Sequence, residues 1–197
     1  MNDFNEICCR MKEHDMPVPQ SQVIVRVPEA RTVLYHYMKD CLAQKRSELN
    51  WLPEYEEVAD WLADNRGRGL FLYGDYGRGK TMLGYHVLPA ILLKYMNKVV
   101  NVYDAQKMNS DIDKLLRKHV ISLDDIGTED TLVSYGNRRL AFAEVMDAAE
   151  KYRKLVIVST NLNGDQIVAR YGQRVMERII SVSRRIRGKS IVSICAS

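Results

Sequence analysis

The segment "GLFLYGDYGRGKT", residues 69–81, combines an apolar run with glycines, a lysine and a hydroxyl at the spacing G-x-x-x-x-G-K-[ST]. Glycines allow backbone angles at which successive N–H groups point at anionic oxygens, and a helix that starts near Lys80 adds the positive end of its dipole. We therefore expect Lys80 to reach the β- and γ-phosphates of a nucleotide and Thr81 to ligate Mg²⁺. The expected nucleotide-binding residues are Gly74, Asp75, Tyr76, Gly77, Arg78, Gly79, Lys80, Thr81 and Met82.

Two consecutive aspartates follow another apolar run, in "HVISLDDIG" at residues 119–127. If Val120–Leu123 is a strand, Asp124 and Asp125 lie at its carboxyl end, where open α/β sheets bind their ligands. Asp124 is then expected to hold Mg²⁺, directly or through water, and Asp125 to polarise the water that attacks the terminal phosphate. The alternative is an ordinary junction between a strand and a loop, with two solvated acids.

A third apolar run, "LVIVSTNLN" at residues 155–163, ends in Thr160 and Asn161. On a strand beside the phosphate-loop strand, Asn161 would lie between the two acids and the terminal phosphate. There its amide would orient water and register whether the phosphate is bound. Asparagine is also a frequent turn residue, so this interpretation depends on the other two segments.

Arginines recur every four residues in "ARYGQRVMERIISVSRRIRGK" at residues 169–189. Arg170, Arg174 and Arg178 would share one face of a helix. That face is either a solvated basic surface or the source of one arginine that reaches the terminal phosphate of a neighbouring subunit. A second basic cluster follows, which either binds phosphate backbones or is solvated, and its members are Arg184, Arg185, Arg187 and Lys189.

Strands that alternate with helices from residue 69 onward are expected to position these groups. The expected strands are Leu70–Tyr73, Val99–Tyr103, Val120–Leu123, Leu155–Ser159 and Ile191–Cys195. The expected helices cover about residues 80–97, 109–118, 137–152 and 164–182. Apolar strands separated by helices are typical of a parallel sheet that is covered on both faces, so the predicted fold is a three-layer α/β domain.

Residues 1–50 are expected to form a mainly helical extension that binds a partner, and residues 51–197 the α/β domain. "MNDFNEICCRMKEHDM" has the pattern of a helix, and the alternating run Val23–Val27 that of a short edge strand. Two amphipathic helices are expected next, over residues 28–49 and about Tyr55–Asp64. Their aromatic residues are interpreted as core rather than as a partner surface.

Composition excludes several classes of protein. The chain has 197 residues, with 46% hydrophobic and 27% charged residues, which is typical of a globular protein with a core. Its net charge of +4 is compatible with nucleic acid but does not argue for it. The cysteines at 8, 9, 41 and 195 have no C-x-x-C spacing, so neither a disulfide nor a cysteine-built zinc site is expected. The sequence shows neither an apolar stretch near ~20 residues nor a signal peptide, so we expect a cytoplasmic protein without membrane contact.

Four segments in this order, "GDYGRGKT", "ISLDDIGTE", "VSTNL" and "YGQRVMERI", resemble the DnaC/IstB branch of the AAA+ ATPases. The resemblance covers about residues 50–195. It implies a P-loop NTPase core with a five-stranded parallel sheet and a central phosphate-loop strand. It also implies ATP with Mg²⁺ and assembly of copies of the chain in the ATP state. This branch contains helicase loaders and transposition helper ATPases.

The resemblance further implies roles for single residues of this chain. Mg²⁺ would be held by Thr81 and Asp124. The residues implied in catalysis are Lys80, Asp125, Asn161, Arg178 and Arg174. Of the two arginines, Arg178 best matches the family's arginine finger, which acts on a neighbouring subunit's nucleotide, and Arg174 is the second candidate.

The chain also departs from the family. Asp125 stands where many AAA+ proteins have glutamate, although aspartate is usual in this branch, and its shorter reach predicts slow turnover. Residues 104–118 leave no room for the extra helix with which helicase loaders often touch single-stranded DNA, so that contact is only weakly supported. The sequence ends at about the fifth expected strand, and no C-terminal helical lid domain is therefore expected.

The leading hypothesis is an ATPase that loads or remodels a replicative DNA helicase during DNA replication. One alternative is a transposition helper that coats DNA and recruits a transposase. Another is an interaction module that ATP binding switches and that hydrolyses little ATP. A small-molecule kinase is disfavoured, because "STNL" follows the acids where such kinases usually carry an arginine-bearing lid.

Overall fold

The computed structural model describes residues 3–16, 18, 20–44, 46–129, 132–134 and 137–188. Its centre is a sheet of five parallel strands in the order β2-β3-β6-β1-β7, which confirms the predicted sheet. These strands are β1 (Gly69–Gly74), β2 (Asn101–Asp104), β3 (Val120–Ile126), β6 (Leu155–Thr160) and β7 (Ser183–Gly188). A separate antiparallel pair consists of β4 (Leu132–Ser134) and β5 (Asn137–Arg139).

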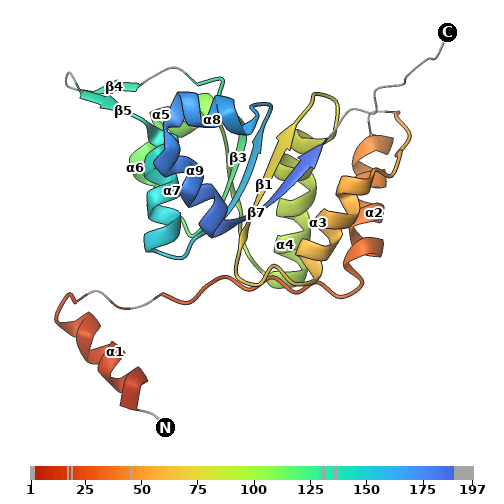
Figure 1. The fold of residues 1–197 in the computed structure, drawn as a ribbon. Helices are drawn as coiled ribbons and strands as arrows, with labels where there is room; N and C mark the ends of the chain where they lie inside the picture. The colour runs from red at the N-terminus through yellow and green to blue at the C-terminus, as the bar shows by residue number, and fades with distance from the viewer. Residues whose placement is uncertain are drawn as a thin grey trace.

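Helices cover both faces of the sheet and complete three layers, as expected (Figure 1). One face is covered by α2 (Ala30–Ala43), α3 (Pro53–Ala63), the π-helix η1 (Met82–Val87) and α4 (Leu88–Met96). The other is covered by α5 (Ala105–Ser110), α6 (Ile112–Leu115), α7 (Ala141–Lys151), α8 (Gly164–Tyr171) and α9 (Gln173–Val182). Helix α1 (Asp3–Glu13) lies apart from these layers. No helix in the described part of the chain has the length and apolarity needed to cross a bilayer.

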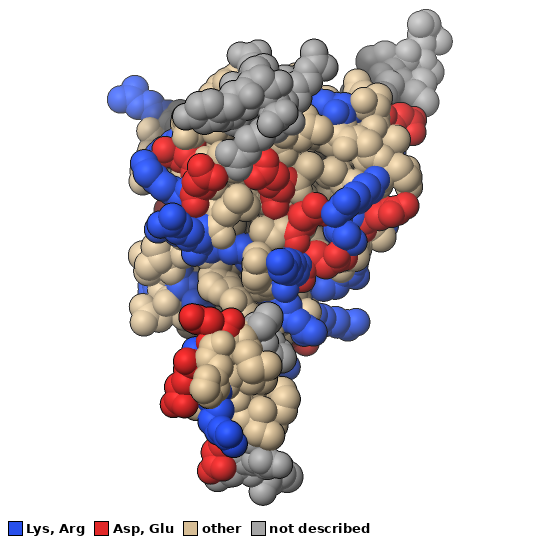
Figure 2. All heavy atoms as spheres, turned by 90° about the vertical axis from the view of Figure 1, so that its left-hand side faces the viewer, with Lys and Arg blue, Asp and Glu red and all other residues tan. Residues whose placement is uncertain are grey.

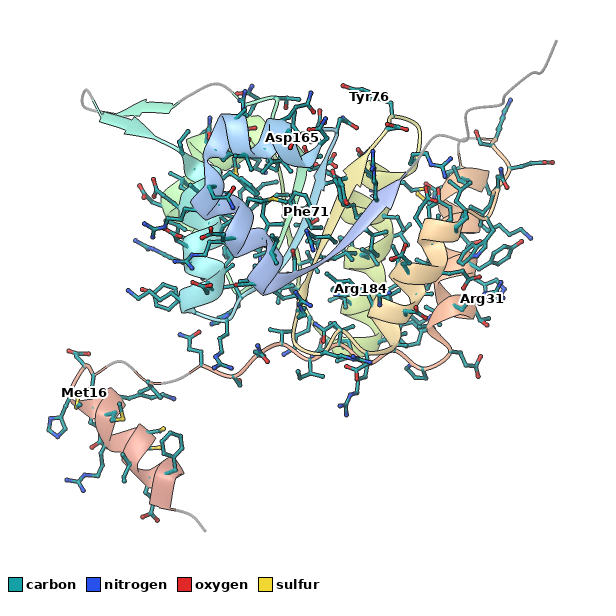
Figure 3. The ribbon with its side chains drawn as sticks, viewed as in Figure 1. Met16, Arg31, Phe71, Tyr76, Asp165 and Arg184 are labelled. Atoms are coloured by element: carbon teal, nitrogen blue, oxygen red, sulfur yellow. The ribbon has the colours of Figure 1, made fainter. Side chains whose placement is uncertain are left out.

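The apolar strand β1 contributes side chains to the hydrophobic cores on both faces of the sheet. Leu70 and Leu72 pack with the helices α2, α3, η1 and α4 on one face. Phe71 packs on the other face and lies between the sheet and the helices α8 and α9 (Figure 3). Successive side chains of a strand point to opposite faces, and burying each large apolar side chain stabilises the fold by about 1.5–3 kcal/mol. The continuous apolar run before the glycines therefore follows from a central strand that is buried on both sides.

One edge strand of the described sheet is β7, which has the sequence SRRIRG and pairs with β1. The expected strand Ile191–Cys195 falls outside the described residues. Ser183 and Ile186 are buried, whereas Arg185 and Arg187 are exposed. An edge strand has one strand neighbour only, and charged side chains are common there. The expected helix over residues 164–182 is divided at Gly172, which has a φ angle of 89°, into α8 and α9, and it ends where β7 begins.

The extended segment Val23–Val27 is not a strand of the sheet, contrary to the prediction. The amide of Asn65 binds it on both sides: Val25 N donates to Asn65 Oδ1 over 2.8 Å, and Asn65 Nδ2 donates to Val23 O over 3.0 Å. Val27 N donates to Leu62 O over 2.9 Å. One buried asparagine and the end of α3 thus satisfy backbone groups that a strand partner would otherwise bind.

Several helix boundaries also differ from the predictions. The helix expected over 109–118 is replaced by α5 and α6, because the side chain of Asp104 accepts a hydrogen bond from Lys107 N over 2.7 Å and caps α5 earlier. Helix α7 begins at 141 rather than 137, since residues 137–139 form β5. Helix α2 ends at Ala43 rather than near 49.

Helix α2 packs into the same core as the α/β layers. Its buried residues Leu34 and Met38 lie in one cluster with Trp61 and Leu62 of α3 and with the apolar residues of β1. Packing therefore continues across residue 50. The division of the chain into a partner-binding part and an ATPase part at that point stays a prediction about roles.

Candidate nucleotide-binding site

The loop between β1 and η1 places three glycines where the backbone φ angle is positive. Gly74, Gly77 and Gly79 have φ angles of 114°, 75° and 72°, which L-residues rarely adopt. A Cβ on Gly74 would lie 2.2 Å from the carbonyl oxygen of Gly188, and one on Gly79 would lie 2.8 Å from the hydroxyl of Tyr55. The glycine spacing of the motif therefore has two causes in this chain, the backbone conformation of the loop and its close approach to β7 and α3.

Lys80 lies at the start of the helix that follows the loop, and it is 9% exposed. Its Nζ donates hydrogen bonds to the carbonyl oxygens of Gly74, over 2.8 Å, and Asp75, over 2.6 Å. Burial lowers the pKa of Lys80, against the opposing effect of the nearby carboxylates of Asp75, Asp125 and Asp124. The ammonium group is therefore held inside the loop, where its partly desolvated positive charge would attract a bound phosphate.

A β-bulge positions the two aspartates. Strands β3 and β6 pair in register up to Leu123, and the register shifts between Leu123 and Ile126. Asp124 is 7% exposed, and its Oδ1 accepts a hydrogen bond from the hydroxyl of Ser159 on β6. The same hydroxyl accepts a hydrogen bond from Asp125 N over 3.1 Å. Bulges re-aim side chains next to functional sites, and this one turns two consecutive residues toward one cavity.

Asp125 and Asn161 meet as the sequence predicted. Asn161 Nδ2 donates to Asp125 Oδ1 over 2.9 Å. Asp125 has a φ of 56°, a left-handed conformation that aspartate tolerates better than most residues. The Asn161 amide thus fixes one oxygen of the Asp125 carboxylate.

These groups line one cavity of about 500 Å³ at the carboxyl ends of β1, β3 and β6. Its lining residues are Tyr76, Gly77, Arg78, Gly79, Lys80, Thr81, Asp124, Asp125, Ser159 and Asn161. Of the predicted nucleotide-binding residues, Gly74, Asp75 and Met82 do not line it, and the Met82 side chain packs into the hydrophobic core. Tyr76 is 81% exposed and lies at the outer end of the loop (Figure 3).

The residues present fit a nucleotide with Mg²⁺. The cavity combines a buried ammonium, loop glycines, the hydroxyl of Thr81 and the carboxylates of Asp124 and Asp125. Within the part of the chain that the structure describes, no cluster of three or more His, Cys, Asp or Glu residues is arranged to hold a metal. Mg²⁺ is commonly bound by one or two carboxylates together with phosphate oxygens and water, so this donor set suits a metal that arrives with a nucleotide.

The two candidate arginine fingers lie away from this cavity. Both are on α9 and bind Asp147 of α7: Arg174 Nη2 over 2.9 Å and Arg178 Nε over 3.2 Å. Arg178 also forms an ion pair with Glu150 over 2.6 Å. Figure 2 shows this side of the molecule, on which acidic and basic side chains are intermixed. Neither arginine lines the cavity of its own chain, so a role in catalysis requires a second subunit.

Sequence reasoning missed Ser159 and Glu129. Ser159 is a small residue inside an apolar strand, and nothing in its neighbourhood along the chain indicates a contact with Asp124 and Asp125. Glu129 is 6% exposed and accepts hydrogen bonds from the hydroxyl of Tyr171 and from Gly127 N, the latter over 2.7 Å. The third arginine of the series, Arg170, donates to the carbonyl oxygen of Glu129. Glu129 therefore holds the segment after Asp125 against α8.

We expect Tyr171→Phe to lower the free energy of unfolding by about 2 kcal/mol, because it leaves a buried carboxylate without one of its donors. Burial and the bond to Glu129 raise the pKa of Tyr171 above its ordinary value of 10.0. The stability that this hydroxyl supplies is therefore complete below pH 10 and is lost as the pH rises further. Urea unfolding at pH 7 and pH 10.5 measures both effects. An equal loss in the control Tyr152→Phe, at an exposed tyrosine, would contradict the assignment.

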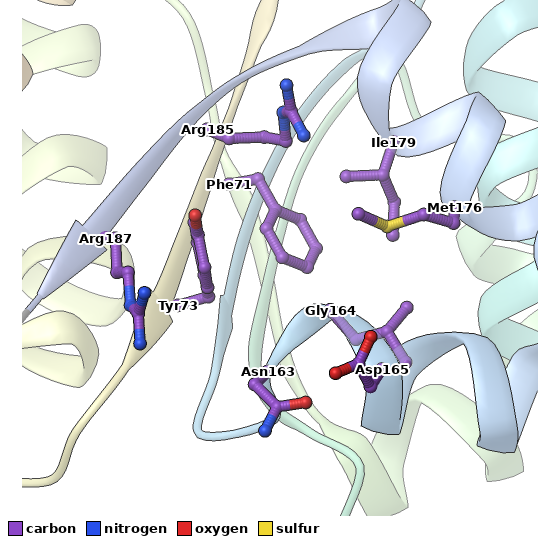
Figure 4. A pocket seen from close by; sticks show the side chains of 10 residues that line it. Phe71, Tyr73, Asn163, Gly164, Asp165, Met176, Ile179, Arg185 and Arg187 are labelled. Carbon is purple, nitrogen blue, oxygen red and sulfur yellow. The ribbon is translucent and has the colours of Figure 1, made fainter.

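A second cavity, of about 310 Å³, lies on the other side of β1, between the sheet and the helices α8 and α9 (Figure 4). Arg185 and Arg187 of β7 line it together with Tyr73. Arg184 points to the opposite face and forms ion pairs with two acids of α3. Lys189 falls outside the described residues. The second basic cluster is thus divided between two faces of an edge strand, and none of the phosphate-loop residues 74–81 lines this cavity.

Comparisons with known proteins place the fold. A scan of protein-family models finds no match to the chain, and a search of curated proteins finds none either. Among solved structures, the crystal structure of the DnaC helicase loader matches with a TM-score of 0.52 and 22% identity, over 62% of this chain and 78% of that chain. The crystal structure of DnaI matches with a TM-score of 0.56 and 20% identity, over 73% of this chain and 88% of that chain.

These likenesses confirm the expected core fold and, at the level of the fold, the expected resemblance to DnaC-type proteins. The chain has the three-layer α/β fold of the DnaC helicase loader and of DnaI.

Proposed function

We propose that the chain is an ATPase of the helicase-loader type. It binds ATP with Mg²⁺, hydrolyses it, assembles with copies of itself in the ATP state and acts on a replicative DNA helicase in the cytoplasm. The observation that carries this proposal is the convergence of Lys80, Asp124 and Asp125 on one cavity, in a fold shared with a structure described as a helicase loader.

Each group at the cavity has a separate task in this proposal. The loop N–H groups and the Lys80 ammonium bind the phosphates, and Thr81 and Asp124 hold Mg²⁺, which neutralises phosphate charge when bound. The Asp125 carboxylate accepts a proton from the attacking water. Asn161 fixes that carboxylate through its 2.9 Å hydrogen bond, so the catalytic base has one preferred orientation.

The proposed helicase contact lies in the N-terminal part. Helix α1 stands apart from the three layers, and it exposes Phe4 (64%) and Ile7 (43%). Exposed apolar side chains on an amphipathic helix commonly mark a protein contact. The mixed charge of the face on α7 and α9 does not add support for single-stranded DNA, which stays the weakest partner prediction.

One pair of variants tests the proposal. Lys80→Ala is expected to weaken ATP binding about 100-fold, because it removes a buried charged partner of the phosphates. Asp125→Asn is expected to retain ATP binding and to lose turnover. Calorimetric titration with ATP and Mg²⁺ measures binding, and phosphate release measures turnover.

The same Asp125→Asn variant, held in the ATP state, then serves as bait in the native host. Recovery of a replicative helicase, absent with Lys80→Ala, supports the loader. Recovery of a transposase instead would favour the transposition helper. If Asp125→Asn retains full biological function while Lys80→Ala has none, the chain is an interaction module that ATP binding alone controls.

A further inference from the structure

Arg78 lies in the phosphate loop, but its side chain bonds to helix α3. Its Nε donates to Glu54 Oε1 over 2.6 Å and its Nη2 to Glu54 Oε2 over 2.9 Å. The two side chains are only 13% and 9% exposed. A bidentate pair between a guanidinium and a carboxylate fixes direction as well as distance. Glu54 therefore constrains the loop at the residue two positions before Lys80.

The ion pair is enclosed on two sides. The Tyr55 hydroxyl donates to Arg78 O over 3.3 Å, so α3 contacts the backbone of the loop as well as its side chain. A Cβ on Gly188, at the end of β7, would lie 3.0 Å from Arg78 Cβ and 3.4 Å from Glu54 Oε1. Burial between a helix and a strand end leaves Arg78 little freedom to move without α3.

The same first turn of α3 also holds α2. The single Nε–H of Arg31 on α2 is shared between the two carboxylate oxygens of Glu56, over 2.7 and 3.0 Å, and Trp51 Nε1 donates to Glu56 over 2.8 Å. The Trp51 ring packs against the rings of Tyr55, at a centroid distance of 5.6 Å, and of Tyr35 on α2, at 5.8 Å. Three consecutive residues of α3, 54–56, thus contact the phosphate loop on one side and α2 on the other.

We propose that this turn couples the nucleotide site to α2, with Glu54 as a positioning residue that acts through Arg78. The inference rests on the proposed function, because it requires the loop to bind ATP. Phosphate binding shifts or stiffens the loop at Arg78, the bidentate pair passes that change to Glu54, and the rigid helical turn passes it to Glu56, Trp51 and α2. Coupling of this kind is reciprocal, so a change in this turn alters the affinity for ATP.

Trp51 provides the readout. Its indole contacts both Tyr55 and Glu56, so ATP with Mg²⁺ is expected to change its fluorescence emission in the full-length protein. The control Trp51→Phe retains Trp61, which is fully buried and donates to backbone carbonyls of residues 68 and 69. The emission change is expected to disappear in that control, while calorimetry still reports ATP binding.

Glu54→Gln tests the positioning residue. It keeps the shape of the side chain and removes the charge that pairs with Arg78. We expect ATP affinity to fall about 10-fold, within the usual range of coupling between sites, and the Trp51 response to be lost. The matched control is Glu57→Gln on the same helix, whose exposed ion pair with Arg184 spans 4.0 Å and should change affinity less than about twofold.

Tyr55→Phe decides the question if Glu54→Gln does not fold. It removes only the hydroxyl that contacts Arg78 O, and it should reduce the Trp51 response while the protein stays folded by circular dichroism. The inference is overturned if the wild-type protein binds ATP by calorimetry and Trp51 does not respond, or if the folded variants respond as the wild type does. If the wild-type protein binds no ATP, the proposed function itself fails, and the inference fails with it.

Discussion

Replacement of Gly74 by alanine is expected to lower the free energy of unfolding by about 4 kcal/mol. The φ angle of 114° is unfavourable for any L-residue, and the added Cβ would lie 2.2 Å from the carbonyl oxygen of Gly188. That carbonyl also accepts a hydrogen bond from Asp75 N over 3.1 Å, so the clash breaks the contact that joins the loop to β7. Urea unfolding measures the loss, and the melting temperature should fall by about 10 °C.

Gly77→Ala is the matched control for this prediction. Gly77 has a φ angle of 75°, but a Cβ there would meet nothing within 4 Å. Only the backbone cost applies, and the expected loss is about 1–2 kcal/mol. Equal losses in the two variants would show that backbone conformation alone, and not the contact with β7, requires glycine at position 74.

The parts of the fold that could be predicted are those in which neighbouring residues share one environment. Leu70–Leu72 and Leu155–Ser159 are buried on both faces, so every residue in them is apolar or small, and the run itself indicates an interior strand of the sheet. The loop motif and Asn161 each follow such a strand, and the two aspartates lie at the carboxyl end of β3. Parallel strands end at the same edge of a sheet, and this rule alone was enough to expect that these residues meet.

Edge elements could not be predicted in the same way. Strand β7 has the sequence SRRIRG. In the described sheet it pairs with one strand only, so it can carry arginines, and it therefore lacks the apolar run that indicates a strand. The segment Val23–Val27 alternates as a strand does, yet its backbone is bound by the side chain of Asn65. Both cases depend on the tertiary neighbours of a segment, which its own residues do not reveal.

Contacts between side chains that are distant in the sequence could not be predicted either. Arg78 had no explanation from the sequence, because its partner Glu54 is 24 residues earlier and resembles any acid in the first turn of a helix. Ser159 gave no signal, because serine is tolerated in buried strands when its hydroxyl finds a partner. The positions of the candidate site residues were therefore predictable, whereas the residues that support them were not.

Arg178→Ala is expected to lower the rate of ATP turnover about 1,000-fold and to leave ATP binding unchanged. This effect is expected if Arg178 acts on the nucleotide of a neighbouring subunit. Arg178 lies on α9, where it binds Asp147 and Glu150, and it does not line the cavity of its own chain. In an assembly, the γ-phosphate of a neighbouring subunit would replace these carboxylates as the partner of the guanidinium. Arg174→Ala is the control, since Arg174 binds the same Asp147 but its side chain is 72% exposed.

A mixing experiment separates a trans role from a structural one. The variants Arg178→Ala and Asp125→Asn are each expected to be inactive alone, for different reasons. In a mixed assembly, an Asp125→Asn subunit still supplies Arg178, and an Arg178→Ala subunit still has an intact Asp125. A site formed by an Arg178→Ala subunit next to an Asp125→Asn subunit therefore has both groups and should recover turnover. Random mixing of the two variants sets the fraction of such sites. A mixture as inactive as its components, or an equal loss with Arg174→Ala, would contradict the assignment of Arg178, because only an arginine that crosses between subunits can restore a site it does not belong to.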